Sequence, residues 1–256
     1  MFDADAAIDR VTAFFEDQLE QTGADAYVVG VSGGLDSALA VTLAARAVGA
    51  DAVVGVLLPA ESSIEENVAD ARELCADLGV ERREASIAPL VETARETYPA
   101  DFDKLTVGNL RARVRMCLLY AEANERDGLV VGPSNKSEYA LGYFTKFGDG
   151  AADVRPFADV YKTELYELAR HVGLDEKFVE KPPSAELWEG QTDEGELGAS
   201  YETVDAILRA LLEKGRSVAE AAAATGTPVE EVERFAAMHR ESRHKRESPP
   251  HPDVPR

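Results

Sequence analysis

The stretch Ser32-Gly33-Gly34-Leu35-Asp36-Ser37 decides the fold class of this chain. It follows a run of apolar, β-branched residues at 26–31, which predicts a buried strand, and it opens a helical pattern at 35–48. Two glycines permit turns that other residues cannot adopt, and the free N–H groups of a helix N-terminus attract anions. The stretch therefore predicts a phosphate-binding loop at the carboxyl end of a sheet strand.

The same two patterns alternate along the rest of the chain. Further strands are predicted at 52–58, 82–87 and 129–132, and helices at 4–22, 64–78, 110–126, 161–172, 200–214, 217–224 and 228–242. Glycine and proline predict long loops at 133–159 and 181–197. Such alternation is typical of α/β proteins, so we expect a Rossmann-like parallel sheet with helices on both faces, plus C-terminal helices.

The composition indicates one globular domain. The chain has 256 residues, of which 45% are hydrophobic, enough for a sizeable core. We expect a single domain at 1–247 and a mobile, proline-rich tail at 248–256. The N-terminus is acidic and no apolar run reaches the roughly 18 residues of a membrane span, so we expect a cytoplasmic protein. Cys75 and Cys117 lie among apolar residues in predicted helices, which indicates buried thiols.

The charge balance is strongly acidic. Asp and Glu number 48 against 27 Lys and Arg, which gives a net charge of −21. Such a surface repels nucleic acid and anionic membranes, so we expect neither as a partner. The acids are spread along the chain instead of forming a tail, which favours the solvated surface of a protein from a salt-adapted organism over a docking site for a basic partner.

Asp36 lies in the first turn of the predicted helix, beside the expected phosphates. An acid there repels phosphate unless a cation lies between them, so the loop predicts Mg²⁺, which takes one or two carboxylates together with phosphate oxygens. The alternative is a tight turn in which Asp36 serves only the helix dipole. The loop is neither a Walker A loop, which ends in Gly-Lys-Ser or Gly-Lys-Thr, nor a dinucleotide fingerprint, which needs a third glycine.

The predicted helix at 110–126 carries an arginine beside an apolar face. At 100° per residue, the face predicted to point to the core consists of Leu110, Val114, Cys117, Leu118 and Ala121. Arg113 falls at the edge of this face. An arginine near a core needs an anionic partner, which is either a ligand or the carboxylate of an internal salt bridge.

Two more charged residues stand out by their position. Glu138 follows the fourth predicted strand, where it either shares a cation with Asp36 or completes a capping box with Asn135. Lys162 lies in the first turn of a helix whose expected N-cap is Asp159. Because the helix dipole disfavours a cation there, either a bound anion offsets the charge of Lys162 or its side chain is exposed.

The glycine loop resembles the pyrophosphate loop of the N-type ATP pyrophosphatases, which adenylylate a substrate and release pyrophosphate. Within that group the chain is similar to the NAD synthetase family through the stretches at 109–116, 142–149, 181–188 and 244–246. The resemblance implies the adenine nucleotide alpha-hydrolase-like fold. It also implies a ligase that amidates deamido-NAD with ammonia and ATP through an adenylylated intermediate, giving NAD, AMP and pyrophosphate.

The same resemblance implies roles for single residues. It assigns ATP to Gly30, Val31, Ser32, Gly33, Gly34, Leu35, Asp36, Ser37, Lys162 and Ser184, deamido-NAD to Arg113, Lys146, Asp153, His244 and Lys245, and Mg²⁺ to Asp36 and Glu138. Asp36, Lys162 and Asp153 are the expected catalytic residues, with Asp153 as our hypothesis for the group that holds ammonium. Pro133 stands where relatives often carry a threonine that contacts ATP, which leaves its role open. The family completes its sites across a homodimer, with the helix at 110–126 in the interface.

Three other functions compete with this interpretation. The first is another ATP-pyrophosphatase-type enzyme, either tRNA-modifying or GMP synthetase-like, which the stretches at 142–198 disfavour. The second is a DNA-binding regulator, because residues 217–234 have helix-turn-helix spacing, although their glutamates would face phosphates. The third is a nucleotide-binding module without catalysis, which a test for AMP production would separate from an enzyme.

Salt should stabilise this chain. Its excess negative charge repels itself in the folded state, and the Debye length falls from about 30 Å at 0.01 M salt to about 3 Å at 1 M. We expect the melting temperature, followed by circular dichroism, to rise between dilute buffer and molar KCl. Equal melting temperatures under the two conditions would contradict this expectation.

Overall fold

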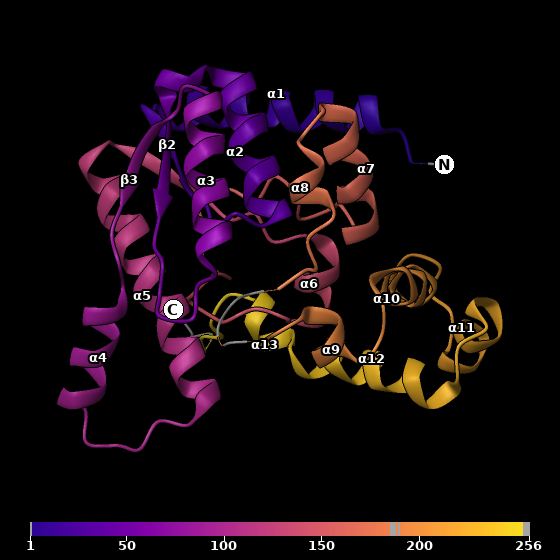
Figure 1. Cartoon of the computed structure of the whole chain (residues 1–256). Helices are drawn as coiled ribbons and strands as arrows, with labels where there is room; N and C mark the ends of the chain where they lie inside the picture. The colour runs from indigo at the N-terminus through magenta and orange to yellow at the C-terminus, as the bar shows by residue number, and fades with distance from the viewer. Residues whose placement is uncertain (1, 185–187, 189, 253–256) are drawn as a thin grey trace.

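A four-stranded parallel sheet lies at the centre of the computed structural model, which describes residues 2–184, 188 and 190–252 (Figure 1). Its strands are β1 (Ala26–Gly30), β2 (Val53–Leu57), β3 (Glu81–Glu84) and β4 (Gly128–Val131), in the spatial order β3-β2-β1-β4. The chain adds β2 and β3 on one side of β1 and then crosses to place β4 on the other. Ligands of such sheets bind where the strand order reverses, here between β1 and β4. The predicted parallel sheet is confirmed.

Helices cover both faces of this sheet (Figure 1). One face packs against α1 (Ala4–Thr22), α2 (Leu35–Val48), α3 (Glu65–Asp77) and α7 (Lys162–Val172), and the other against α4 (Ala88–Thr97) and α5 (Lys104–Glu125). The buried side chains of β1 alternate, with Tyr27 and Val29 on the first face and Val28 on the second. Parallel strands buried on both sides are apolar throughout, which makes them recognisable in a sequence.

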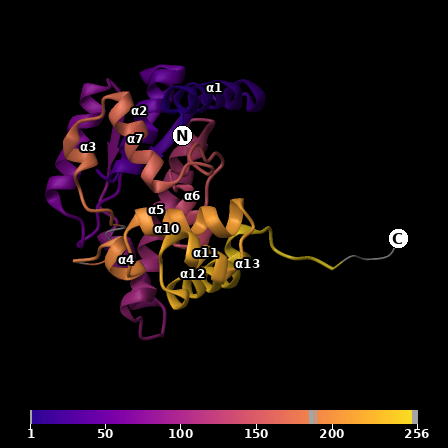
Figure 2. The same ribbon diagram turned by 90° about the vertical axis from the view of Figure 1, so that its right-hand side faces the viewer.

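The C-terminal helices form a lobe beside the sheet, from which the tail extends (Figure 2). The lobe contains α10 (Tyr201–Leu208), a π-helical turn at Arg209–Glu213, α11 (Val218–Thr225), α12 (Val229–Glu241) and α13 (Arg243–Arg246). Its core is centred on Val204, Ile207, Val232 and Phe235. Helix α10 packs against α7 and against α6 (Lys136–Leu141), so the lobe contacts the segments that follow β4.

Several short elements depart from the sequence predictions. α6 and α9 (Asp193–Leu197) lie within the predicted loops, and α4, α8 (Glu176–Val179) and the 3₁₀ turn η1 (Ala50–Ala52) were missed. The short helices α6, α8 and α9 show no hydrophobic period, and local caps define them instead. Helix α4 is longer, with ten residues, and its N-cap residue Ile87 makes no side-chain cap. The Asn135 side chain accepts the N–H of Glu138, and Thr192 accepts that of Gly195. Residues 185–187 and 189 of the second predicted loop lie outside the described residues.

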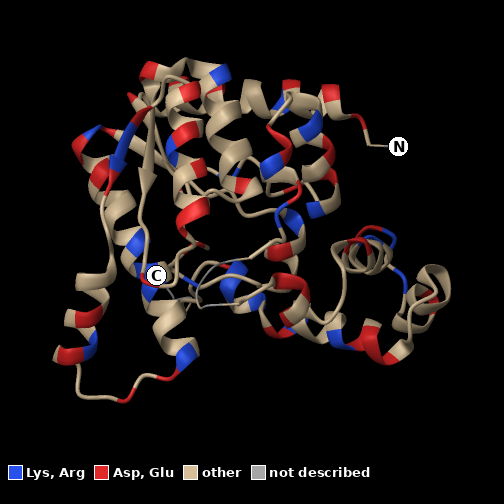
Figure 3. Ribbon diagram, in the orientation of Figure 1, with Lys and Arg blue, Asp and Glu red and all other residues tan. Residues whose placement is uncertain are grey.

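The edge strand β3 is shorter than the predicted strand at 82–87 and carries charged residues only. Arg72 contacts Glu84 at 2.6 Å and Arg126 contacts Glu81 at 2.6 Å, which ties this edge to α3 and to the end of α5. Figure 3 shows acidic and basic residues distributed over the helices and on this strand. Charges on an edge strand discourage pairing with another chain.

Helix α5 begins before the predicted position and turns the opposite face to the sheet. Its buried residues are Gly108, Ala112, Met116, Leu119 and Ala123. The face predicted to be buried is therefore wrong, and its member Cys117 is exposed, whereas Cys75 is buried as expected. Both faces of α5 are apolar, and the smaller side chains allow the closer approach to the sheet. An outward apolar face then needs its own explanation.

Two further expectations concern the ends of the chain. Residues 248–252 have no regular secondary structure and are exposed, and 253–256 lie outside the described residues, so the mobile tail stays a prediction. The single domain at 1–247 also stays a prediction. Within the described part of the chain, every helix is too short or too polar to cross a membrane.

Candidate active site

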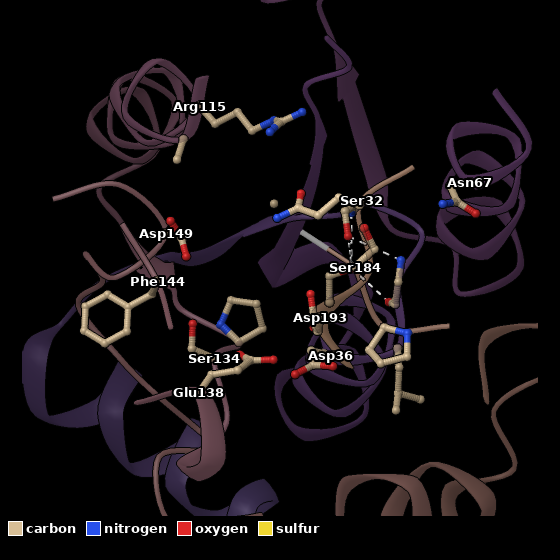
Figure 4. A pocket seen from close by; sticks show the side chains of 18 of the residues that line it. Ser32, Asp36, Asn67, Arg115, Ser134, Glu138, Phe144, Asp149, Ser184 and Asp193 are labelled. Atoms are coloured by element: carbon tan, nitrogen blue, oxygen red, sulfur yellow. Dashed lines mark hydrogen bonds between the residues drawn. The ribbon is translucent and has the colours of Figure 1, made fainter. Parts of the chain in front are cut away.

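A cavity of about 850 Å³ opens at the carboxyl ends of β1, β2 and β4, where the strand order predicts a ligand (Figure 4). The predicted site residues that line it are Gly30, Val31, Ser32, Gly34, Leu35, Asp36, Ser37, Glu138, Lys162, Ser184 and Lys245. Gly33, Arg113, Lys146, Asp153 and His244 are not among the described residues that line it. Pro133 is part of the wall, next to Ser134.

The glycine turn is shaped by its neighbours. Gly33 has a φ of +84°, and a Cβ atom there would lie 2.0 Å from the carbonyl oxygen of Asn67 in α3. Only glycine fits both the left-handed backbone and this close approach. Gly34 is the N-cap of α2 and brings no side-chain cap, while Ser37 Oγ accepts the N–H of Ser32 at 3.2 Å. The turn therefore leaves the start of α2 facing the cavity, as a phosphate site requires.

Lys162 lies at the centre of the charged groups in the cavity. Its ammonium group contacts the carboxylate of Asp36 and lies 3.5 Å from Glu138 Oε1. The amide of Asn135 donates to Asp36 Oδ2 at 2.8 Å. Only 5% of the Lys162 side chain is exposed, so the exposed-lysine alternative is wrong. The N-cap of α7 is Tyr161, which corrects the expected Asp159.

The carboxylates in this cluster outnumber the cation. Burial, reinforced by the nearby charge of Asp36, raises the pKa of the Glu138 carboxyl to about 8. Burial opposes the charge on Lys162, but Asp36 and Glu138 outweigh it and raise the pKa of the ammonium group. Burial also raises the pKa of Asp193, which accepts the Tyr201 hydroxyl at 3.1 Å (Figure 4). Carboxylate oxygens are the ligands that a hard divalent cation takes, and such a cation would displace the protons that burial favours here.

Lys181 is a cavity residue to which sequence reasoning assigned no role. Its ammonium group donates to the carbonyl of Gly33 at 3.2 Å and contacts the carboxylate of Asp70 in α3. Lys177 lies 3.2 Å from the same carboxylate. These contacts tie the segment after α8 to the glycine turn. The proline-rich stretch around Lys181 was the available signal, but its pairing with α3 is a tertiary contact.

A second group of basic residues gathers beside the cavity. Lys146 Nζ donates to the carbonyl of His244 at 2.6 Å, and Arg113 donates to the carbonyl of Lys146 at 3.3 and 3.2 Å. Lys245 reaches into the cavity wall, where Nζ donates to the carbonyls of Gly142 and Phe144 at 2.8 Å each. Four residues predicted for one substrate, from three distant parts of the sequence, therefore lie together. We name Arg113, Lys146, His244 and Lys245 the basic cluster.

Two aspartates, Asp153 and Asp149, are candidates for a proton acceptor at this site. Asp153 is exposed, and its carboxylate accepts the N–H of Val130 at 2.8 Å and the hydroxyl of Tyr120 at 3.3 Å. Asp149 faces the cavity, where its carboxylate accepts the N–H of Thr145 at 3.0 Å (Figure 4). Desolvation raises the pKa of Asp149. Sequence reasoning missed Asp149, because its position in the glycine-rich stretch does not reveal its direction.

A parallel sheet with a glycine turn at its switch point and a charged cavity beside it defines an α/β protein of the adenine nucleotide alpha-hydrolase-like fold. Comparison with known protein families identifies the family within this fold class. The family model described as NAD synthase matches residues 7–249, and the chain belongs to that family.

Individual relatives span nearly the whole chain. The NH(3)-dependent NAD(+) synthetase of Thermococcus kodakarensis is 43% identical over 248 residues, 97% of each chain. That of Methanocaldococcus jannaschii is 40% identical over 250 residues, 96% of each chain. Among solved structures, an NMN synthetase from Francisella tularensis has a TM-score of 0.88 at 32% identity. An NH3-dependent NAD synthetase from Campylobacter jejuni, in complex with nitrate, has a TM-score of 0.84 at 28% identity; both matches cover 99% of this chain and 100% of the other.

The raised pKa of Glu138 makes stability depend on pH. Its carboxyl group titrates near 4.5 when unfolded and at about 8 when folded, so the folded chain holds the extra proton between these values. This group's contribution to the free energy of unfolding therefore falls as the pH rises from about 4.5 to about 8. Urea denaturation across this range, without metal or nucleotide, should show a shallower decline for Glu138→Gln.

The matched control is Glu202→Gln, which removes an exposed carboxylate from α10. It should leave the decline unchanged. An identical pH dependence for wild type and Glu138→Gln would show that Glu138 does not hold this proton.

Proposed function

We propose that this chain is an ammonia-dependent NAD synthetase, which uses ATP to convert the carboxylate of deamido-NAD into the amide of NAD. Membership of the NAD synthase family supports this proposal, as do relatives bearing that name over 97% and 96% of this chain. The single observation that carries it in the structure is the cavity in which Asp36, Glu138 and Lys162 meet the glycine turn. The alternatives, a tRNA-modifying or GMP synthetase-like enzyme, have no such support.

The first half-reaction requires a site for pyrophosphate. The nicotinate carboxylate attacks the α-phosphorus of ATP, and pyrophosphate leaves. The N–H groups of residues 32–37 and the ammonium group of Lys162 stabilise the leaving charge. In the second half-reaction, ammonia attacks the acyl-adenylate and releases AMP.

Magnesium fits the carboxylates of this site. Asp36 and Glu138 supply oxygen ligands next to the predicted phosphates, and the raised pKa of Glu138 reports negative charge that a cation would compensate. When bound, the ion would neutralise charge on the phosphate oxygens. Asn135 holds the carboxylate of Asp36 through its amide, so one oxygen of Asp36 is oriented before any ion arrives.

Deamido-NAD carries a pyrophosphate and a carboxylate, which the basic cluster suits. In a chain with net charge −21, the neighbouring cations Arg113, Lys146 and Lys245 favour the binding of an anion. Asp149 faces the cavity, so we assign to it the proton that ammonium must lose before attack. We propose that Asp153 contacts deamido-NAD from outside the cavity, since it is not among the described residues that line the cavity.

A homodimer explains the outward face of α5. Leu110, Val114, Cys117, Leu118 and Ala121 leave an apolar strip that is only partly covered within one chain. Arg113 lies between this strip and the cavity, so a second copy seated on the strip would approach the basic cluster.

We further propose that the protein works in a salt-rich cytoplasm, to which its acidic surface is suited and in which ATP and deamido-NAD are available.

Two substitutions should distinguish the residues that act on ATP from those that bind deamido-NAD. Asp36→Ala removes a metal ligand and should lower ATP-dependent pyrophosphate release by at least about 100-fold. Arg113→Ala removes a charge from the basic cluster and should raise KM for deamido-NAD by about 10-fold, with KM for ATP nearly unchanged. The assay contains ATP, magnesium, ammonia and deamido-NAD, and records NAD and AMP.

The same assay tests the function. Nicotinate mononucleotide replaces deamido-NAD in a parallel reaction, because a solved relative is an NMN synthetase. Absence of NAD formation by the wild-type chain would sink the proposed function. Near-normal pyrophosphate release by Asp36→Ala would contradict the assignment of Asp36 as a metal ligand. An equal rise in KM for ATP and for deamido-NAD in Arg113→Ala would contradict the assignment of Arg113 to deamido-NAD.

Charge placed on the outward face of α5 should separate the two copies. Cys117 is exposed in one chain, so Cys117→Arg costs the monomer little but buries a charge if a second copy covers it. Sedimentation should give twice the chain mass for wild type and for the control Cys117→Ser, and a single chain mass for Cys117→Arg. A monomeric wild type would refute the homodimer.

A further inference from the structure

A carboxylate outside the cavity connects the segments that carry its charged residues. Asp205 lies in α10, only 2% exposed, and is not among the described residues that line the cavity. Its Oδ2 accepts the N–H of Thr163 at 2.9 Å and the hydroxyl of Thr163 at 2.8 Å. Its Oδ1 accepts the hydroxyl of Ser137. One buried side chain thus joins α10, α6 and the first turn of α7.

Ser137 extends this connection to the backbone of Lys162. Its hydroxyl donates to Asp205 and, with its lone pairs, accepts the N–H of Lys162 at 2.9 Å. In α6, Ser137 directly precedes Glu138, and Asn135 caps the same helix while holding Asp36. Any shift of Ser137 or of the start of α7 would therefore change the separation of Glu138 and Lys162.

Stability alone does not account for a carboxylate at this place. Burying a carboxylate is unfavourable, and a hydrophobic side chain in a lobe core is often as stabilising as a buried charge. Burial raises the pKa of Asp205, and its donors Ser137 and Thr163 oppose that shift. Buried polar groups that are fully satisfied do fix a unique geometry. The geometry fixed here is that of the residues facing the cavity.

We propose that Asp205 is a positioning residue for the adenylylation step, acting through Ser137 and Thr163 to hold Lys162 and Glu138 at their working separation. The proposal rests on the function proposed above, in which these two residues act on ATP. It also gives the C-terminal lobe a role, because the lobe supplies the group that fixes the far side of the cavity.

A second contact between the same segments provides a matched control. Glu164 is also buried, accepts the N–H of Tyr161 at 2.9 Å and contacts Arg209 in the turn after α10. It therefore ties α7 to the lobe just as Asp205 does. The side chain of Glu164 has no hydrogen bond to Ser137 or Lys162 among those that the described residues make. Glu164→Gln removes a charge at the junction, keeps an oxygen that can accept the N–H of Tyr161, and leaves the link through Ser137 in place.

The experiment measures pyrophosphate release with saturating deamido-NAD, the affinity for ATP with magnesium present, and the melting temperature. Asp205→Asn keeps the shape of the side chain but cannot accept at both atoms. We expect it to lower kcat for pyrophosphate release by about 10- to 100-fold, as the loss of supporting contacts to site residues typically does. Glu164→Gln should lower the melting temperature by about as much as Asp205→Asn does, but should change kcat by less than about twofold.

Combination with Lys162→Met separates a positioning role from general damage. Because Asp205 acts partly through Lys162, Asp205→Asn should weaken ATP binding in the wild-type background and add much less in the Lys162→Met background, where only the effect on Glu138 is left. The same loss in both backgrounds, or parallel losses of kcat in Asp205→Asn and Glu164→Gln, would overturn the proposal. Should Asp205→Asn fail to fold, Ser137→Ala removes the same link from the other end and should give the same loss.

Different results would overturn the proposed role of Lys162 and the positioning role of Asp205. Normal ATP affinity and pyrophosphate release in Lys162→Met would overturn the proposed role of Lys162 and the role of Asp205 with it. A strong loss in Lys162→Met beside unchanged activity in both Asp205→Asn and Ser137→Ala would overturn only the positioning role.

Discussion

The contact of Lys162 with the carboxylates of Asp36 and Glu138 is the interaction on which the site depends. These charges lie in a cavity where burial penalises each of them separately, so they are stable only together. Because the pKa of Glu138 is raised to about 8, this carboxyl holds a proton at neutral pH, and a bound cation would have to displace that proton before both carboxylates could serve as ligands.

The fold makes this cluster possible by bringing distant residues to one edge of the sheet. Asp36 follows β1, Glu138 follows β4, and Lys162 begins α7 after a further loop. Because β1 and β4 are neighbours only through a crossover, the cavity opens where the strand order reverses. Gly33 then allows α3 to approach closely, and Lys181 fastens the segment after α8 to the same turn.

The sequence predicts those features of the structure that depend on residues close together in the chain. The glycine turn, the parallel strands and the apolar sheet core could be predicted, because a buried strand and a helix start each have a local signature. The direction of α5 could not, since both of its faces are apolar and only the sheet selects the face with small residues. The family resemblance assigned Arg113, Lys146 and His244 to the same substrate, and in the structure they lie side by side.

Residues that act through others leave no local signature. Asp205 reads in the sequence as an ordinary acid on an amphipathic helix, and Asp149 as one polar residue in a glycine-rich loop. Their importance comes from direction: Asp205 turns inward to Ser137 and Thr163, and Asp149 turns into the cavity. In a chain with 48 acids, composition conceals such residues, since most of the others lie on the surface. What distinguishes Asp205 is burial with satisfied donors, because the hydrogen bonds of a buried carboxylate hold a geometry that an apolar side chain would not.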